Sequence, residues 1–177
     1  MSRITKEMIL GARIVDLHKT FVTVNGLNEY SVYFTVDRGF TFRTPCAGQP
    51  WETCTVPPEA EQLKDYIVRS FKYERRWWGG VRRVEDPSTV IDFVQRIKGR
   101  SIAGVYFGAF DPSVGGHHPW DGSLVLDDGS QVSNNVVAPQ GTSRGGLYYF
   151  PGGSDQCKPM DRMTDYFTIP LEEDSPA

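Results

Sequence analysis

The sequence has no long apolar run, few cysteines and no excess of basic residues. A membrane-spanning helix needs about 18 or more consecutive apolar residues, and no such stretch occurs. The first residues, MSRITKEMIL, lack the apolar core of a signal peptide, so we expect a cytoplasmic protein with no membrane partner. The three cysteines, Cys46, Cys54 and Cys157, argue against a disulfide framework because their number is odd and the chain is long.

The charge balance and the missing motifs exclude further classes of protein. Lys and Arg together number 19 and Asp and Glu 22, which gives a net charge of −3. General nucleic-acid binders carry a basic excess, so nucleic acid is not the expected partner, although a local basic patch would still permit it. The motifs GxSxG, GxxxxGK[ST] and HExxH are absent. We therefore assign no catalytic residue and no cofactor, and we expect a protein that is not an enzyme.

One loop, residues 111–122, carries side chains of the types that bind metals. His117, His118 and Asp121 lie close together in it. Neighbouring histidines rarely bind the same ion, and a closed structural site needs about four ligands. We therefore predict no metal and interpret the segment as a surface loop.

Two β-rich segments, residues 1–50 and 100–150, resemble each other. Apolar and polar residues alternate in EYSVYFTV (29–36), which is typical of a half-buried strand. GARI at 11–14 matches GRSI at 99–102 at an offset of 88, and VDRG at 36–39 matches LDDG at 126–129 at an offset of 90. Either two repeated units share one core, or glycine, aspartate and apolar residues simply recur, as in any antiparallel protein.

The segment between these units, residues 57–99, has the pattern of two helices. PPEAEQLKDYIVRSFKYERRW begins with prolines and acidic residues, which suit a first helical turn, and has one apolar stripe at 3-4 spacing. DPSTVIDFVQRIKG (86–99) has an N-cap aspartate and a closing glycine. The expected fold is therefore α+β: one domain over 1–177, with antiparallel sheets from two similar β units, a two-helix insertion, and a loop-rich tail at 151–177.

The most unusual stretch is YERRWWGGVRR (73–83), because residues 72–83 carry a net charge of +4 in an acidic chain. Arginine and tryptophan dominate binding hot spots, since they combine contact area with directed hydrogen-bond donors. Two adjacent tryptophans at a helix end cannot both point inward, so we expect at least one to be exposed. The alternative is that one indole packs in the core while the arginines are solvated or pair with Glu85 and Asp86. The predicted partner-binding residues also include loop residues: Arg75, Arg76, Trp77, Trp78, Arg82, Arg83, Trp120, Asp121, Asp127 and Asp128.

The order of strand, D-x-G turn, strand, and a proline followed shortly by a glycine recurs in VDRGFTFRTPCAG and in LDDGSQVSNNVVAPQG. This texture resembles bacterial immunity proteins of polymorphic toxin systems, over about half of the chain. The resemblance implies a cytoplasmic protein that binds a cognate toxin tightly and occludes its active site. Aromatic anchors such as Trp77, Trp78 and Trp120 would bury area, while arginines or loop aspartates would pair with charges on the toxin.

Two other functions stay open at this point. One is a small hydrolase or transferase with its site in the Gly/His loops, using His117, His118 and Asp121. The other is a nucleic-acid or phage-defence factor that uses the Arg-Trp stretch at 72–83.

Overall fold

The computed structural model describes residues 1–24, 27–46, 49–63, 67–68, 71–85, 91–108, 122–135, 137–138, 146–154, 157 and 159–169. Antiparallel strands dominate these residues, as predicted, and the helices are short. The helices are α1 (Lys6–Ile9), α2 (Phe93–Ile97) and the 3-10 turns η2 (Met160–Arg162) and η3 (Tyr166–Thr168).

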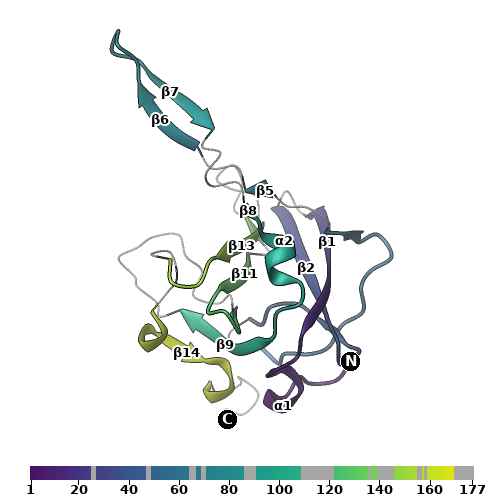
Figure 1. The fold of residues 1–177 in the computed structure, drawn as a ribbon. Coiled ribbons are helices and arrows are strands. Elements are labelled where there is room, and N and C mark those ends of the chain that lie inside the picture. The colour runs from purple at the N-terminus through teal and green to yellow at the C-terminus, as the bar shows by residue number, and fades with distance from the viewer. Residues whose placement is uncertain are drawn as a thin grey trace, which may run out of the picture.

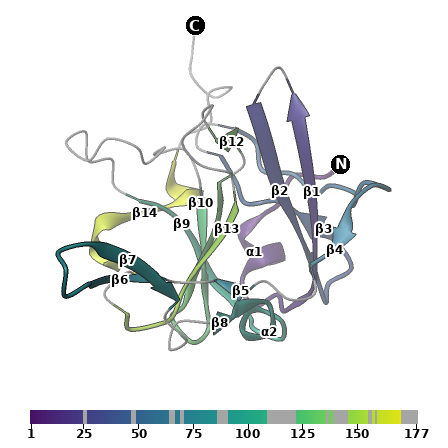
Figure 2. The same cartoon turned by 90° about the horizontal axis from the view of Figure 1, so that it is seen from above.

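Two five-stranded sheets form the body of the molecule and lie side by side in Figures 1 and 2. The first sheet contains β1 (Ile14–Val24), β2 (Leu27–Val36), β3 (Thr41–Phe42), β4 (Glu61–Gln62) and β12 (Val137–Ala138). The second contains β9 (Ile102–Gly108), β10 (Gly122–Leu126), β11 (Gln131–Asn135), β13 (Gly146–Phe150) and β14 (Met163–Asp165). Two smaller sheets pair β5 (Ile67–Val68) with β8 (Ile91–Asp92), and β6 (Phe71–Arg75) with β7 (Val81–Glu85).

The two matched GARI and GRSI segments pair with each other antiparallel, through a bridge between Arg13 and Ser101. The Gly11 amide donates to the Ile102 carbonyl at 2.8 Å, and the Gly99 amide donates to the Ile14 carbonyl at 2.8 Å. Two further bonds repeat the exchange: Ile14 N to Arg100 O and Ile102 N to Ala12 O, both 2.9 Å. When the residue numbers of the two segments are exchanged by the offset of 88, each of these four hydrogen bonds becomes another of the four. The two segments are therefore related by a local two-fold axis.

The hairpins that follow these segments also share their geometry. The β1–β2 register slips by one residue at Val15, and the β9–β10 register slips at Ala103, the position 88 residues later. The D-x-G turns match as well, because Gly39 and Gly129 both take positive φ, +82° and +78°. The repeat in the sequence therefore corresponds to a repeat in backbone structure.

Each unit also contributes chain to the other unit's sheet. Strand β12 follows β11 of the second sheet but pairs with β2 of the first. In the reverse direction, the Gly122 amide of β10 donates to the carbonyl of Pro45, which follows β3, at 2.8 Å. Only glycine fits there, since a Cβ on Gly122 would lie 2.8 Å from that carbonyl oxygen. The two sheets are thus tied together by the backbone and not only by side-chain packing.

One hydrophobic core serves both sheets. The apolar face predicted for β2 is buried at Tyr30, Val32, Phe34 and Val36. Ser31 and Tyr33 on the opposite face are buried as well, so β2 is not the half-buried strand that the alternation predicts. Successive aromatic rings run from the first sheet to the second, with each neighbouring pair of centroids 5.3–5.8 Å apart: Phe34, Phe42, Trp51, Tyr166 and Phe107. Tyr166 belongs to the tail that we expected to be loop-rich, so the tail contributes both an edge strand, β14, and a core side chain.

The first predicted helix, over residues 57–78, is wrong. The described residues of that stretch form β4, β5 and β6 instead. Aromatic and β-branched residues, which favour strands, are frequent between positions 67 and 84, and the apolar spacing at 3 and 4 was coincidental. The second predicted helix is confirmed only as α2, over Phe93–Ile97, and residues 86–90 lie outside the described part.

The hairpin β6–β7 stands apart from both large sheets. Its two strands pair only with each other among the described strands, from Phe71–Glu85 at the base to Arg75–Val81 near the turn. In Figure 1 it extends away from the body of the molecule. The tryptophans that we expected at a helix end therefore lie in a hairpin turn.

The shared core can be tested through its two-fold related isoleucines. Ile14 and Ile102 are both fully buried, so Ile14→Ala and Ile102→Ala should each lower the free energy of unfolding by about 2–5 kcal/mol. Val15→Ala is the control, since Val15 is 44% exposed, and should change it by less than about 0.5 kcal/mol. Urea unfolding measures all three, and an isoleucine variant as stable as the control would contradict the single core.

Candidate partner-binding hairpin

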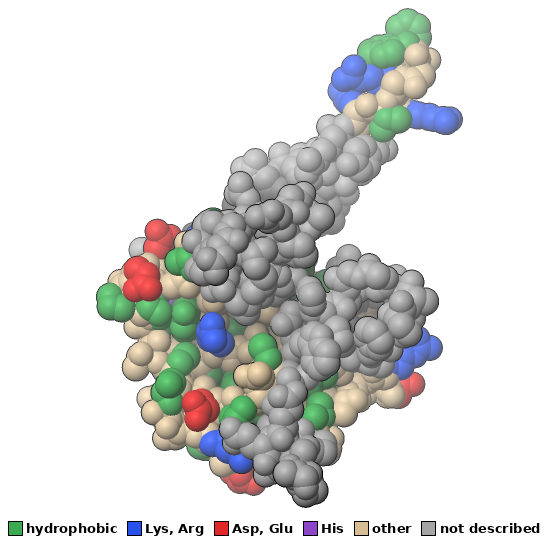
Figure 3. Space-filling view, turned by 180° about the vertical axis from the view of Figure 1, so that it is seen from behind, with side chains coloured by type: hydrophobic (Ala, Val, Ile, Leu, Met, Phe, Trp, Pro, Cys, Tyr) green, Lys and Arg blue, Asp and Glu red, His purple; other side chains and the backbone are tan. Residues whose placement is uncertain are grey.

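The turn of the β6–β7 hairpin exposes a cluster of apolar side chains. Trp77 is 92% exposed, Trp78 60% and Val81 61%. Figure 3 shows apolar and basic side chains together at the projecting end of the molecule. Isolated exposed apolar residues are ordinary, but two neighbouring indoles in water are costly unless they contact something else. Both tryptophans are exposed, which meets the expectation that at least one would be.

Local contacts hold this tip in a defined shape. The turn closes through the Arg76 amide, which donates to the Gly80 carbonyl at 2.6 Å, and Gly79 takes a φ of +88° that other residues rarely adopt. The two indoles meet edge to face, with centroids 5.3 Å apart and planes at 81°. The Arg76 guanidinium lies 5.2 Å from the Trp78 ring centroid, which is cation–π distance. Trp78 is therefore braced on two sides, while Trp77 is almost wholly in solvent.

The arginines of the hairpin are not equivalent. Arg82 lies directly opposite Glu74 in the strand register, and the two form an ion pair of 3.1 Å. Within the described part of the chain, no carboxylate lies within ion-pair distance of Arg75 or Arg76. The side chain of Arg83, on β7, is outside the described residues. Among the described side chains near the tip, Arg75 and Arg76 are thus the guanidinium groups without a carboxylate partner.

The other predicted partner-binding residues lie elsewhere in the chain. Trp120 and Asp121 fall outside the described residues, as do His117 and His118. Among the residues that are described, no three His, Cys, Asp or Glu side chains gather closely enough to hold a metal ion.

Asp127 and Asp128 lie in the turn between β10 and β11, where both already have partners. Arg100 lies 3.5 Å from Asp127 and 3.4 Å from Asp128. Asp128 also accepts hydrogen bonds from the Ser130 amide at 3.0 Å and from its hydroxyl at 2.6 Å. Partial burial raises the pKa of Asp128, but the Ser130 hydrogen bonds and the Arg100 charge outweigh it, so this pKa lies below its usual range. These contacts stabilise the turn, and the binding role of both aspartates stays a prediction.

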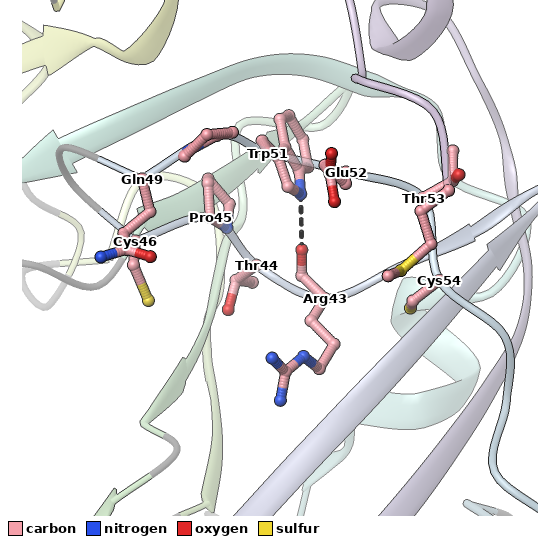
Figure 4. Close-up of a pocket in the computed structure, with 11 residues that line it drawn as sticks. Arg43, Thr44, Pro45, Cys46, Gln49, Trp51, Glu52, Thr53 and Cys54 are labelled. Carbon is pink, nitrogen blue, oxygen red and sulfur yellow. Dashed lines mark hydrogen bonds between the residues drawn. The ribbon is translucent and has the colours of Figure 1, made fainter. Parts of the chain in front are cut away.

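A cavity of about 310 Å³ lies beside the buried Trp51 and was not anticipated from the sequence. Residues of the connection between β3 and β4 line most of it, and Figure 4 shows the Trp51 indole donating to the Arg43 carbonyl, at 2.7 Å. Two thiols, Cys46 and Cys54, are in the lining. Burial raises the pKa of Cys54 against the opposing charge of Arg43, so its reactive thiolate form is disfavoured. Cys54 is therefore not an activated nucleophile.

Comparison with protein-family models, with curated proteins and with solved structures finds no match. In the ranges that the structure describes, none of the helices has the length and apolar content needed to cross a bilayer.

Because the tip lies outside the core, replacing its tryptophans should affect stability differently from replacing a core tryptophan. Trp77→Ala with Trp78→Ala should change the free energy of unfolding by less than about 0.5 kcal/mol, because both indoles are exposed. Trp51→Ala should cost about 3–5 kcal/mol, because that indole is buried. Chemical denaturation gives the free energies, and acrylamide quenching of fluorescence should fall in the double variant. A large loss of stability in the double variant would contradict an exposed tip.

The lowered pKa of Asp128 makes its contribution to stability dependent on pH. A carboxylate with a depressed pKa stabilises the fold above its unfolded pKa, about 4, and this contribution is lost as pH falls through the folded pKa. Asp128→Asn should therefore cost on the order of 1 kcal/mol at pH 7, and the deficit should shrink below pH 4. Thermal unfolding of both proteins between pH 2 and 8, about the range where carboxylates titrate, measures this. A deficit that stays constant with pH would refute the assignment.

Proposed function

We propose that this protein acts by binding another macromolecule through the tip of the β6–β7 hairpin. The observation that carries the proposal is the pair of exposed indoles, Trp77 and Trp78, on a ribbon that extends from the body of the molecule. Tryptophan and arginine are the residues most enriched in binding hot spots. Trp78 is held by Trp77 and Arg76 before any partner arrives, so little side-chain entropy is lost on binding.

A binding role accounts for these features better than an enzymatic one. The described cavity, beside Trp51, contains a cysteine whose raised pKa disfavours the thiolate. The tip of the hairpin combines exposed apolar area with positive charge, which suits recognition of a surface. The Gly/His loops of the enzymatic alternative lie outside the described residues, so no observed geometry favours that alternative.

The specific form that we propose is neutralisation of a cognate bacterial toxin, in keeping with the resemblance to immunity proteins. A two-stranded ribbon is about 5 Å between strand axes, and five residues extend it by about 17 Å. Such a projection can enter a cleft and exclude substrate from it. Survival beside an active toxin requires nanomolar affinity or better, about 12 kcal/mol, and one or two anchors such as Trp77 can supply much of it. The surface around the hairpin base would supply the remaining contact area.

Co-expression with the product of the adjacent gene in the source genome tests this function. The intact chain should restore growth of cells that express that product, and the purified proteins should form a complex. Trp77→Ala with Trp78→Ala should weaken the complex by at least about 30-fold, or 2 kcal/mol, because the anchors are lost. Tyr148→Ala is a matched control, since Tyr148 is an exposed aromatic residue, at 41%, outside the hairpin. An intact chain that neither protects cells nor forms a complex would refute the proposal, as would a double variant that protects as well as the control.

A further inference from the structure

Charge is divided unequally between the hairpin and the rest of the molecule. The chain carries −3 overall and +3 within the hairpin, residues 71–85, so the remaining residues carry −6. From this division and the geometry of the tip, we infer that the hairpin recognises an acidic cleft on a protein, in which carboxylates flank an apolar floor. This inference rests on the proposed function and names the chemistry of the partner.

The hairpin is long enough to separate its charge from that of the body. Its five-residue strands extend about 17 Å, and ionic screening at physiological salt acts over about 8 Å. The negative charge of the body therefore does not cancel the field at the tip. A molecule polarised in this way approaches a negative site with its tip first, and such steering raises the rate of association.

Arg75 and Arg76 are the groups that suit carboxylates at the tip. Arg82 is neutralised by Glu74 at 3.1 Å and adds little net charge. Arg76 is held 5.2 Å from the Trp78 ring centroid, so its planar guanidinium is positioned beside the apolar cluster. A guanidinium binds a carboxylate through two parallel hydrogen bonds, which are strong where water is excluded. Trp77 and Trp78 would exclude that water by covering the floor of the cleft.

The same features argue against nucleic acid as the partner. Affinity for nucleic acid comes largely from neutralising many phosphates, whereas the described side chains of the tip offer two guanidinium groups without a carboxylate partner. Nucleic acid is also a long polyanion, so the part of it that extends past the tip would be repelled by the acidic body. A cleft confines its negative charge to the place where the hairpin enters. The charges therefore favour a protein with an acidic cleft as the partner.

Tryptophan fluorescence can test this chemistry with two defined probes, poly-L-glutamate and the oligonucleotide dT20. At about 0.1 M ionic strength, where screening acts over about 10 Å, the intact chain should bind poly-L-glutamate in a saturable way and bind dT20 at least tenfold more weakly. Arg75→Gln with Arg76→Gln should weaken the binding of poly-L-glutamate at least tenfold. Lys19→Gln with Glu61→Gln is the matched control, because these two residues form an ion pair of 3.7 Å on the first sheet, outside the hairpin. The change removes one charge of each sign and should leave binding unchanged within about twofold.

Three results would overturn the inference: equal or tighter binding of dT20, no binding of poly-L-glutamate, or equal losses in the Arg75/Arg76 variant and the control. Circular dichroism of each variant shows that a loss of binding is not a loss of folding. The inference and the proposed function fail separately. If the complex with the adjacent gene product depends on Trp77 and Trp78 but not on Arg75 and Arg76, the function stands and the acidic cleft is refuted.

Discussion

The backbone exchange between residues 11–14 and residues 99–102 is the constraint on which the rest of the structure depends. Its four hydrogen bonds, 2.8–2.9 Å long, place the two units about a local two-fold axis. This pairing sets Ile14 and Ile102 at the start of their strands, both fully buried, and the bulges that follow turn β1 and β9 in the same way. Neither unit could cover its own apolar face, so each becomes stable only when the other is present.

The two units form one core between them, so the segment that connects them contributes little to that core. Among its described side chains, the connection contributes Leu63, Val94 and Ile97 to the core, all near its ends. Between these anchors the chain can leave the body and return. An isolated two-stranded hairpin is marginally stable in water, and the contacts that define this one are local: the turn at Gly79, the Glu74–Arg82 pair and the edge-to-face pair of indoles. The body is thus held together without the hairpin, and packing in the core does not determine the sequence of the hairpin.

The β units could be predicted from the sequence, and the hairpin could not. Alternation in residues 29–36 and the two D-x-G turns are local signals, and they gave the correct strands and the correct repeat. The ring contact between Trp51 and Tyr166 joins residues 115 positions apart, which no local pattern encodes. In residues 57–78 a 3-4 apolar spacing and a strand pattern overlap, and WWGG can equally end a helix or turn a hairpin. Only the pairing of β6 with β7 decides between them, and it places both tryptophans in solvent.

An exposed pair of indoles would ordinarily promote association between copies of the chain, because apolar tips attract each other. Here the arginines beside them oppose it. Arg75 and Arg76 lack counter-charges among the described residues, so two tips that approach each other bring like charges together before the indoles can touch. An acidic partner meets attraction from the same groups. Under the proposed binding role, charge therefore selects the partner first, and the apolar area contributes only after the charges have matched. Replacing the arginines with neutral residues would remove both the attraction to an acidic partner and the repulsion between two tips. The basic and aromatic residues of this turn therefore act together.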